Sequence, residues 1–113
     1  MAVNSKRKGA AGERELAHKL NDYGYKTRRS VQYNGKSEDG QADLLGLPGI
    51  HIECKRVEKL NLYDAMAQAI HDAKDGEIPT VFHRRNHSEW LVTMRLDDWN
   101  KLYKEYFETV VEK

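Results

Sequence analysis

The sequence predicts a single α/β domain in which helices flank a mixed sheet, with elements in the order α-β-β-β-α-β-β-α. Two kinds of pattern carry this prediction. Apolar side chains alternate along several short segments, as strands require, and recur every three or four positions along three others, as helices require. The chain has 113 residues, which suits one domain, and no repeat or linker divides it.

The first helix is expected from about residue 10 to residue 23, after a polar and basic flexible arm at residues 1–8. It has an apolar stripe that includes Leu16 and Leu20, and Gly24 suits the left-handed position just past its end. Glu13 extends this stripe backwards. Two interpretations stay open: a carboxylate turned towards the sheet for a functional reason, or a first-turn surface residue that favours the helix dipole.

Residues 25–33 alternate as the first strand. The polar segment 34–40 contains two glycines and is expected to be a loop. Such a loop could close over a substrate, or it could be an inert connection.

Residues 41–47 and 50–56 are expected to form a hairpin, and the length of its loop decides which way Asp43 faces. A two-residue turn would pair Asp43 with Cys54 and turn it away from Glu53. A three-residue loop at residues 47–49 instead sets Asp43 opposite Glu53, with Cβ atoms about 5 Å apart.

The second helix is expected over residues 63–73, capped by Asn61 with Asp64 reaching back to it. Strands follow at residues 78–83 and 89–94. The side chains of this helix that are expected to face the core are Leu62, Met66, Ala69, Ile70 and Ala73.

The last helix is expected within residues 96–113, with Asp97 as its cap. The aromatic residues near it are more than one short helix needs. They could cover the sheet or form a subunit interface, and the core is the default. These residues are Trp90, Trp99, Tyr103, Tyr106 and Phe107.

The net charge of +1 does not by itself indicate a nucleic-acid-binding protein, but the charges are unevenly placed. Basic runs beside a few acids suit a site that grips phosphates and holds a cation. The one cysteine, Cys54, allows no disulfide within the chain, which favours an intracellular, cytoplasmic setting. No signal peptide or membrane-length apolar run is expected.

The strand at residues 50–56 carries the candidate chemistry, because His51, Glu53 and Lys55 share one of its faces. With Asp43 they form the pattern D…ExK. Two carboxylates and a strand carbonyl are hard oxygen ligands that suit Mg²⁺ or Mn²⁺. Lys55 could orient a metal-bound water and stabilise negative charge. The alternative is a solvated strand face with a cross-strand ion pair.

This pattern resembles the core of the PD-(D/E)xK nuclease superfamily. Over most of residues 8–95 the motifs look like those of archaeal-type Holliday-junction resolvases and of resolvase-like endonucleases encoded by phages and prophages. The motifs are Lys8-Gly9, Gly12-Glu13-Arg14-Glu15-Leu16, Tyr23-Gly24-Tyr25, Ala42-Asp43-Leu44-Leu45-Gly46, Ile52-Glu53-Cys54-Lys55, and Tyr63 followed by Gln68.

The resemblance implies a restriction-endonuclease-like core and a homodimer that cuts opposite strands of branched DNA with Mg²⁺. It assigns metal binding to Glu13, Asp43, Glu53 and the backbone carbonyl of Cys54, and the catalytic role of a lysine to Lys55. Candidate DNA contacts are Lys8, Arg14, Arg28, Arg29, Ser30, Lys36, Arg56 and Gln68.

Three features depart from the family pattern. The family's mobile loop near Ser30 is not well matched, so the pattern does not decide which of Arg28, Arg29, Ser30 and Lys36 contact DNA. Ala42 stands where a proline usually precedes the motif aspartate, as in many superfamily members. Gln68 matches a recurring helix glutamine, but the expected helix places it opposite Met66 and Ile70, so either the helix is rotated or Gln68 is a surface residue.

Three functions follow from these observations. The first is a metal-dependent, structure-selective DNA endonuclease. The second is a nicking or restriction-like endonuclease of the same superfamily without junction preference. The third is a non-catalytic DNA-binding dimer, against which the clustered acids argue, because carboxylates gathered without a cation repel one another.

Overall fold

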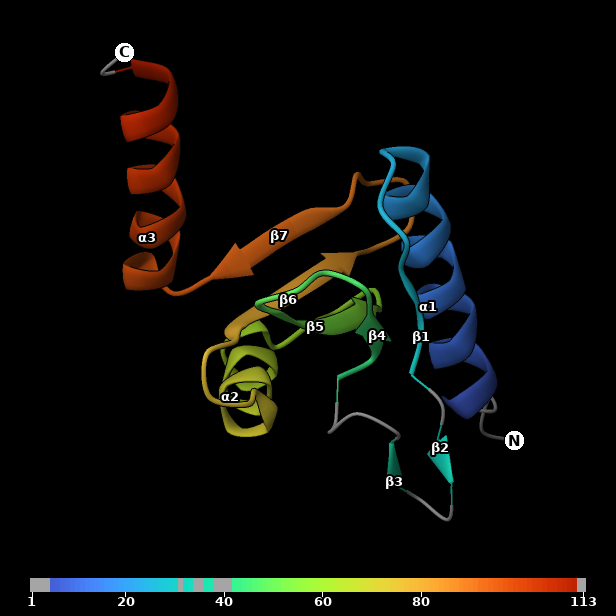
Figure 1. Cartoon of the computed structure of the whole chain (residues 1–113). Helices are drawn as coiled ribbons and strands as arrows, with labels where there is room; N and C mark the ends of the chain where they lie inside the picture. The colour runs from blue at the N-terminus through green and yellow to red at the C-terminus, as the bar shows by residue number, and fades with distance from the viewer. Residues whose placement is uncertain (1–4, 31, 34–35, 38–41, 112–113) are drawn as a thin grey trace.

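The sheet has five strands, in the order β1-β4-β5-β6-β7, in a computed structural model that describes residues 5–30, 32–33, 36–37 and 42–111 (Figure 1). Strands β5 and β6 are parallel, and the other neighbouring pairs are antiparallel. The predicted α/β class with a mixed sheet is therefore confirmed. The strands are β1 (Arg28–Arg29), β4 (Leu44–Leu45), β5 (Ile50–Arg56), β6 (Ile78–Arg84) and β7 (Leu91–Met94).

The N-terminal part differs from the prediction in two ways. Helix α1 (Ser5–Asp22) begins earlier than expected, so residues 5–8 belong to a helix and not to a flexible arm. The expected strand at residues 25–33 is shorter, since only β1 joins the sheet. Beyond it, β2 (Gln32–Tyr33) pairs with β3 (Lys36–Ser37) in a separate two-stranded ladder, and β3 lies inside the expected loop.

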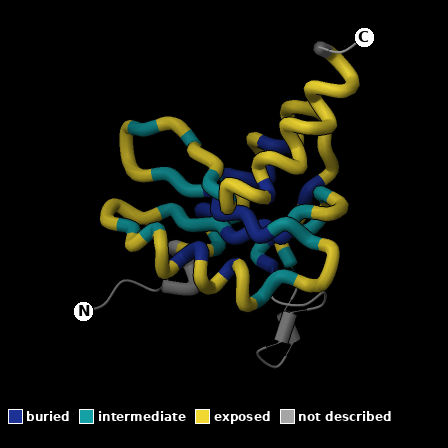
Figure 2. Tube along the Cα trace, turned by 90° about the vertical axis from the view of Figure 1, so that its left-hand side faces the viewer, coloured by how far each residue is buried: buried dark blue, intermediate teal, exposed yellow. Residues whose placement is uncertain are grey.

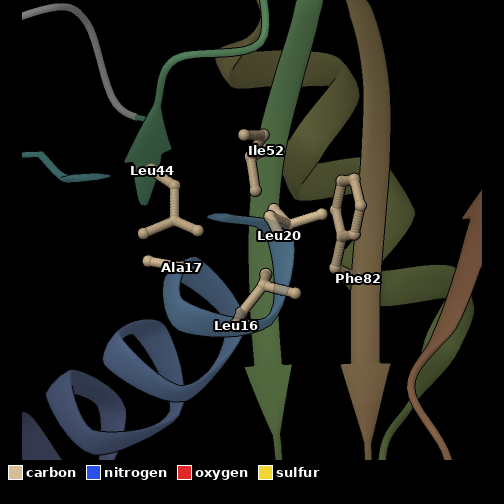
Figure 3. Packing of buried hydrophobic residues seen from close by; sticks show 6 residues of the cluster. All are labelled: Leu16, Ala17, Leu20, Leu44, Ile52 and Phe82. Atoms are coloured by element: carbon tan, nitrogen blue, oxygen red, sulfur yellow. The ribbon is translucent and has the colours of Figure 1, made fainter. Parts of the chain in front are cut away.

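Helix α1 covers one face of the sheet, and its apolar stripe packs against β4, β5 and β6 (Figure 3). Its end at Gly24 has the expected left-handed backbone, with φ of 108°. Burial of this cluster from water fixes α1 on the sheet. The cluster consists of Leu16, Ala17, Leu20, Leu44, Ile52 and Phe82.

Helix α2 (Leu62–Asp72) covers the other face, where Ala65, Met66 and Ala69 pack against Val81 of β6. The predicted cap is confirmed, since the Asp64 backbone N–H donates to the Asn61 side chain at 3.1 Å. The helix is rotated from the expected orientation. Ala65 is buried, and Ile70 is exposed instead of facing the core.

Helix α3 (Leu96–Tyr106) and the π-helical turn η1 (Phe107–Val111) stand away from the sheet (Figure 1). Two predictions are wrong here. Arg95, not Asp97, is the cap residue, and Asp97 lies in the first turn. The aromatic residues of this segment are exposed and not part of the core (Figure 2). Within the described part of the chain, no helix combines the length and apolar character that crossing a membrane needs.

Candidate active site

The sequence prediction that Glu53 and Lys55 share a strand face is confirmed by their contact. Lys55 Nζ lies 3.8 Å from Glu53 Oε2, and the other carboxylate oxygen, Oε1, lies 3.2 Å from His51 Nε2. Glu53 pairs in register with Val81, so this face is the one covered by α2. Glu53 is only 2% exposed. The alternative of a solvated strand face is therefore wrong for Glu53, which is a buried carboxylate between two potential cations.

Asp43 lies at the end of β4, in the register that the three-residue loop requires. Leu44 pairs with Ile52, which sets Asp43 next to Glu53 by continuation of the ladder. The backbone N–H of Cys54 donates to Asp43 Oδ2 at 2.7 Å. This hydrogen bond holds the carboxylate against the backbone of β5.

The environment of Asp43 strongly favours its neutral form. Burial raises the pKa of Asp43 from 3.8 to about 7, because the charged form loses its water. The negative charge of Glu53, and more weakly that of Glu13, also raises this pKa, whereas the Cys54 N–H and the Lys55 ammonium lower it. Three carboxylates and one ammonium are thus close enough to influence one site.

Glu13 reaches this site from α1. It does not lie in the first turn, because α1 begins at Ser5, so the interpretation as a first-turn surface residue is wrong. Its side chain is 19% exposed, and its Oε1 accepts a hydrogen bond from Arg29 Nε at 2.9 Å. The preceding Gly12 is buried, and a Cβ there would lie 2.6 Å from Cβ of Arg56. Gly12 thus permits the close approach of α1 to β5 that brings Glu13 to the sheet.

Gln68 contacts the site, which settles the ambiguity left by the sequence. Lys55 Nζ donates to Gln68 Oε1 at 3.3 Å, so the rotated α2 carries Gln68 to the lysine. His51 was not predicted to have a role. It is buried beside Glu53, and its Nδ1 lies 3.9 Å from Glu77 Oε1. The sequence could have indicated this contact, because His51 lies two residues before Glu53 on the same face of the strand.

A hard divalent cation fits the chemistry of this donor set. Among the described residues, no three Asp, Glu, His or Cys side chains are already gathered as metal ligands. The carboxylates are instead held by Arg29, by the Cys54 amide, and by His51 with Lys55. The donors are oxygens, which Mg²⁺ prefers. Burial and neighbouring acids raise the pKa of the Cys54 thiol, so it is not a soft thiolate ligand.

The arginines among the candidate DNA contacts differ in how accessible they are. Arg14, Arg28 and Arg29 are exposed near α1 and β1, although Arg29 also pairs with Glu13. Arg56 is less accessible than expected, because it pairs with Glu15 at 3.5 Å and Glu58 at 3.8 Å.

The remaining candidates are more varied. Ser30 is half-buried, and its Oγ has no hydrogen-bond partner among the described residues. The side chains of Lys8 and Lys36 and most of the 34–40 segment lie outside the described structure.

A family model described as "Phage putative PDDEXK endonuclease" matches residues 4–113, which is nearly the whole chain. No curated protein matches the chain. The matched family has the D…ExK pattern in its description, and the chain has it in Asp43, Glu53 and Lys55.

Proposed function

The chain belongs to this family of phage PD-(D/E)xK endonucleases, and we propose that it is a metal-dependent, structure-selective DNA endonuclease. It would hydrolyse phosphodiester bonds in branched DNA, as a Holliday-junction resolvase does. The observation that carries the proposal is that Glu13, Glu53 and Lys55 all lie close enough to Asp43 to shift its pKa, which burial first and the two neighbouring acids second raise to about 7.

Four oxygen donors would hold the cation in this proposal: the carboxylates of Glu13, Asp43 and Glu53, and the backbone carbonyl of Cys54. In a strand, the N–H and C=O of one residue point to the same side. The Cys54 N–H points to Asp43, so its carbonyl lies on that side as well. Mg²⁺, or Mn²⁺ in its place, would neutralise the scissile phosphate and lower the pKa of a bound water.

The protein groups have separate roles. Lys55 lies beside Glu53, where its ammonium would orient the attacking water and stabilise the negative charge that develops on the phosphate. Gln68 restrains that ammonium through its hydrogen bond, and His51 restrains the carboxylate of Glu53. A carboxylate held on one oxygen by His51 keeps the other oxygen turned towards Lys55.

DNA is the proposed partner, and basic side chains beside the acids support this. Arg29 contacts Glu13 of the candidate cation site, and Arg14 and Arg28 are exposed on the same two elements, α1 and β1, where they could contact the phosphates of a duplex. Cutting two opposing strands of one junction needs two sites, so the proposal includes a homodimer. Its setting would be the host cytoplasm, where DNA recombination produces branched substrates.

The test is cleavage of a synthetic four-way junction and of a linear duplex of the same sequence, with Mg²⁺ or Mn²⁺. We expect Lys55→Ala and Glu53→Gln to lower the rate of junction cleavage about 10²–10⁴-fold, since they remove transition-state stabilisation and a cation ligand. Lys59→Ala, which changes an exposed lysine just beyond β5, is the control and should cleave like the wild type.

The outcomes separate the three functions. Cleavage that survives both substitutions in folded protein would end the catalytic proposal. Equal cleavage of junction and linear duplex would assign the protein to the nicking or restriction-like class. DNA binding without cleavage, together with no binding of Mg²⁺ or Mn²⁺ in a calorimetric titration, would show a non-catalytic DNA-binding dimer.

A further inference from the structure

The last helix carries an exposed apolar stripe. Five residues at helical spacing along α3 and η1 form it: Leu96, Trp99, Tyr103, Tyr106 and Val110. They are between 42% and 75% exposed. Figure 2 shows this end of the chain as exposed almost throughout. We call these five residues the C-terminal stripe. An exposed apolar surface of this kind marks a contact with another molecule more often than a solvent-facing side.

The rings of the C-terminal stripe are gathered and not scattered around the helix. Trp99 and Tyr103 are stacked, with ring centroids 5.1 Å apart, and the Tyr103 and Tyr106 centroids are 5.8 Å apart. The spacing alternates between three and four residues, which is the pattern by which two helices pack along a seam. The stripe is therefore shaped to meet a further helix or groove.

The rest of the chain gives this segment little support. A helix of this length is marginal in water on its own. Figure 1 shows α3 pointing away from the sheet and from both other helices. The C-terminal helix is thus an element whose apolar side lacks a covering surface within the described chain.

Strand β7 extends the same surface. It is the last strand of the sheet among the described residues, so its outer edge has no paired strand there. Leu91 and Val92 are 59% and 55% exposed, on opposite faces of β7. Only Arg95 separates β7 from α3. Because the helix leaves β7 directly and points outward, the C-terminal stripe does not cover the strand that precedes it.

A groove of about 430 Å³ lies between α2 and β7, at the base of α3. Its lining is mainly apolar and includes Met66, Ile70, Met94 and Leu96, with Tyr63 at its rim. Tyr63 is 88% exposed and Ile70 is 40% exposed. The chain therefore presents a projecting apolar helix and, at its base, an apolar groove that this helix lines only with Leu96.

We propose that the C-terminal stripe and the groove between α2 and β7 form the interface with a second copy of this chain. The C-terminal stripe of each copy would pack against the stripe and the groove of the other copy, in an arrangement with two-fold symmetry. With about 150–250 Å² for each aromatic ring, the exposed stripe, Leu102, Phe107 and Leu91 offer on the order of 800 Å², which is one partner's share of a standard interface. This surface deepens the proposed homodimer, but it rests on α3 and not on the cleavage chemistry.

The test is the mass of the full chain in solution, measured by light scattering across a dilution series. We expect twice the chain mass of 13.1 kDa for the wild type. Trp99→Glu and Tyr103→Glu should each raise the dissociation constant of the dimer at least tenfold, because each places a charge in the apolar seam. Lys104→Glu, on the far side of the same helix, is the matched control and should remain dimeric. Circular dichroism of each variant checks that the sheet and the first two helices remain folded.

Two results would overturn the proposal: a wild type that is monomeric at all concentrations, or a dimer that persists in the Trp99→Glu, Tyr103→Glu double variant. A monomeric wild type whose DNA binding is lost with Tyr103→Glu would instead assign the stripe to DNA. Lys55→Ala separates this proposal from the nuclease proposal. It should leave the mass unchanged whether or not it abolishes cleavage.

Discussion

Two regions of the molecule break the usual rule of apolar inside and polar outside, in opposite directions. On β5, at the centre of the sheet, Glu53 and His51 are almost fully buried. At the β7–α3 end, Trp99, Tyr103 and Leu96 are exposed. Buried polar groups and exposed apolar surfaces are the two departures that carry information about function. One region holds buried carboxylates, whose charges the proposed cation would balance, and the other holds exposed rings, which the proposed second copy would cover.

Burying charged groups and exposing apolar rings both cost free energy, and the protein offsets these two costs in different ways. In the candidate active site the protein compensates internally, with Arg29 on Glu13, a backbone N–H on Asp43 and His51 with Lys55 on Glu53. Around α3, stacking of neighbouring rings compensates only in part. The carboxylates of the first region therefore have partners within the chain, whereas the rings of the second would be covered only in the proposed dimer. Variants in one region should leave the properties of the other unchanged.

The largest effect is expected from Asp43→Asn, in the absence of metal. The pKa of Asp43 is about 7 in the folded chain and near 3.8 when unfolded, so the folded state binds the proton more tightly. The contribution of this bound proton to the free energy of unfolding is complete below about pH 4 and is lost as the pH rises through about 7. At about pH 8, Asp43→Asn should raise the free energy of unfolding by up to about 4 kcal/mol, with no change in solution mass.

Chemical denaturation at several pH values measures this effect. Asp75→Asn, at an exposed position, is the control and should keep the pH dependence of the wild type. Mg²⁺ should stabilise the wild type at about pH 8 but not Asp43→Asn, because the cation replaces the proton. A wild type with equal stability at pH 4 and 8 would contradict the raised pKa of Asp43.

An intermediate effect is expected from Gly12→Ala, which tests how α1 brings Glu13 to the site. The new Cβ would lie 2.6 Å from Cβ of Arg56, so the helix or the strand must shift. We expect a loss of about 1–3 kcal/mol in the free energy of unfolding and a lower cleavage rate. Gly9→Ala on the same helix meets nothing within 4 Å and should stabilise by roughly 0.5–1 kcal/mol. Equal stability of the two variants would show that α1 does not need this close approach.

The sequence predicted the elements of the fold well where a periodic pattern had one interpretation. The order of helices and sheet strands, the Asn61 cap and the face shared by Glu53 and Lys55 all follow from local spacing and are confirmed. Parity showed which loop length would set Asp43 beside Glu53 but left two lengths open, and the register agrees with the three-residue loop. These features depend on neighbouring residues, which a sequence displays directly.

The errors arose where an amphipathic pattern did not say what covers it. The stripe at Trp99 and Tyr103 has the spacing of a core helix, but α3 projects from the fold, and spacing does not distinguish a core from an interface. The rotation of α2 that carries Gln68 to Lys55 also depends on packing between distant elements. Asp97 failed as a cap because the helix begins at Leu96, two residues earlier than a cap at Asp97 requires. Packing between distant elements, or its absence, decided the first two cases.

The smallest effect is expected from Gln68→Ala, at the solvent-exposed margin of the active site. Its amide oxygen accepts the hydrogen bond from Lys55 Nζ at 3.3 Å, so its loss frees the ammonium to move. One such bond contributes about 0.5–1.5 kcal/mol, which corresponds to a fall in cleavage rate of up to roughly tenfold. Stability and solution mass should not change, because Gln68 is exposed and lies outside the C-terminal stripe. His71→Ala on the same helix should cleave at the wild-type rate. If Gln68→Ala also cleaves at the wild-type rate, Glu53 alone positions Lys55. Only the buried residues of the site would then hold its charged groups in place.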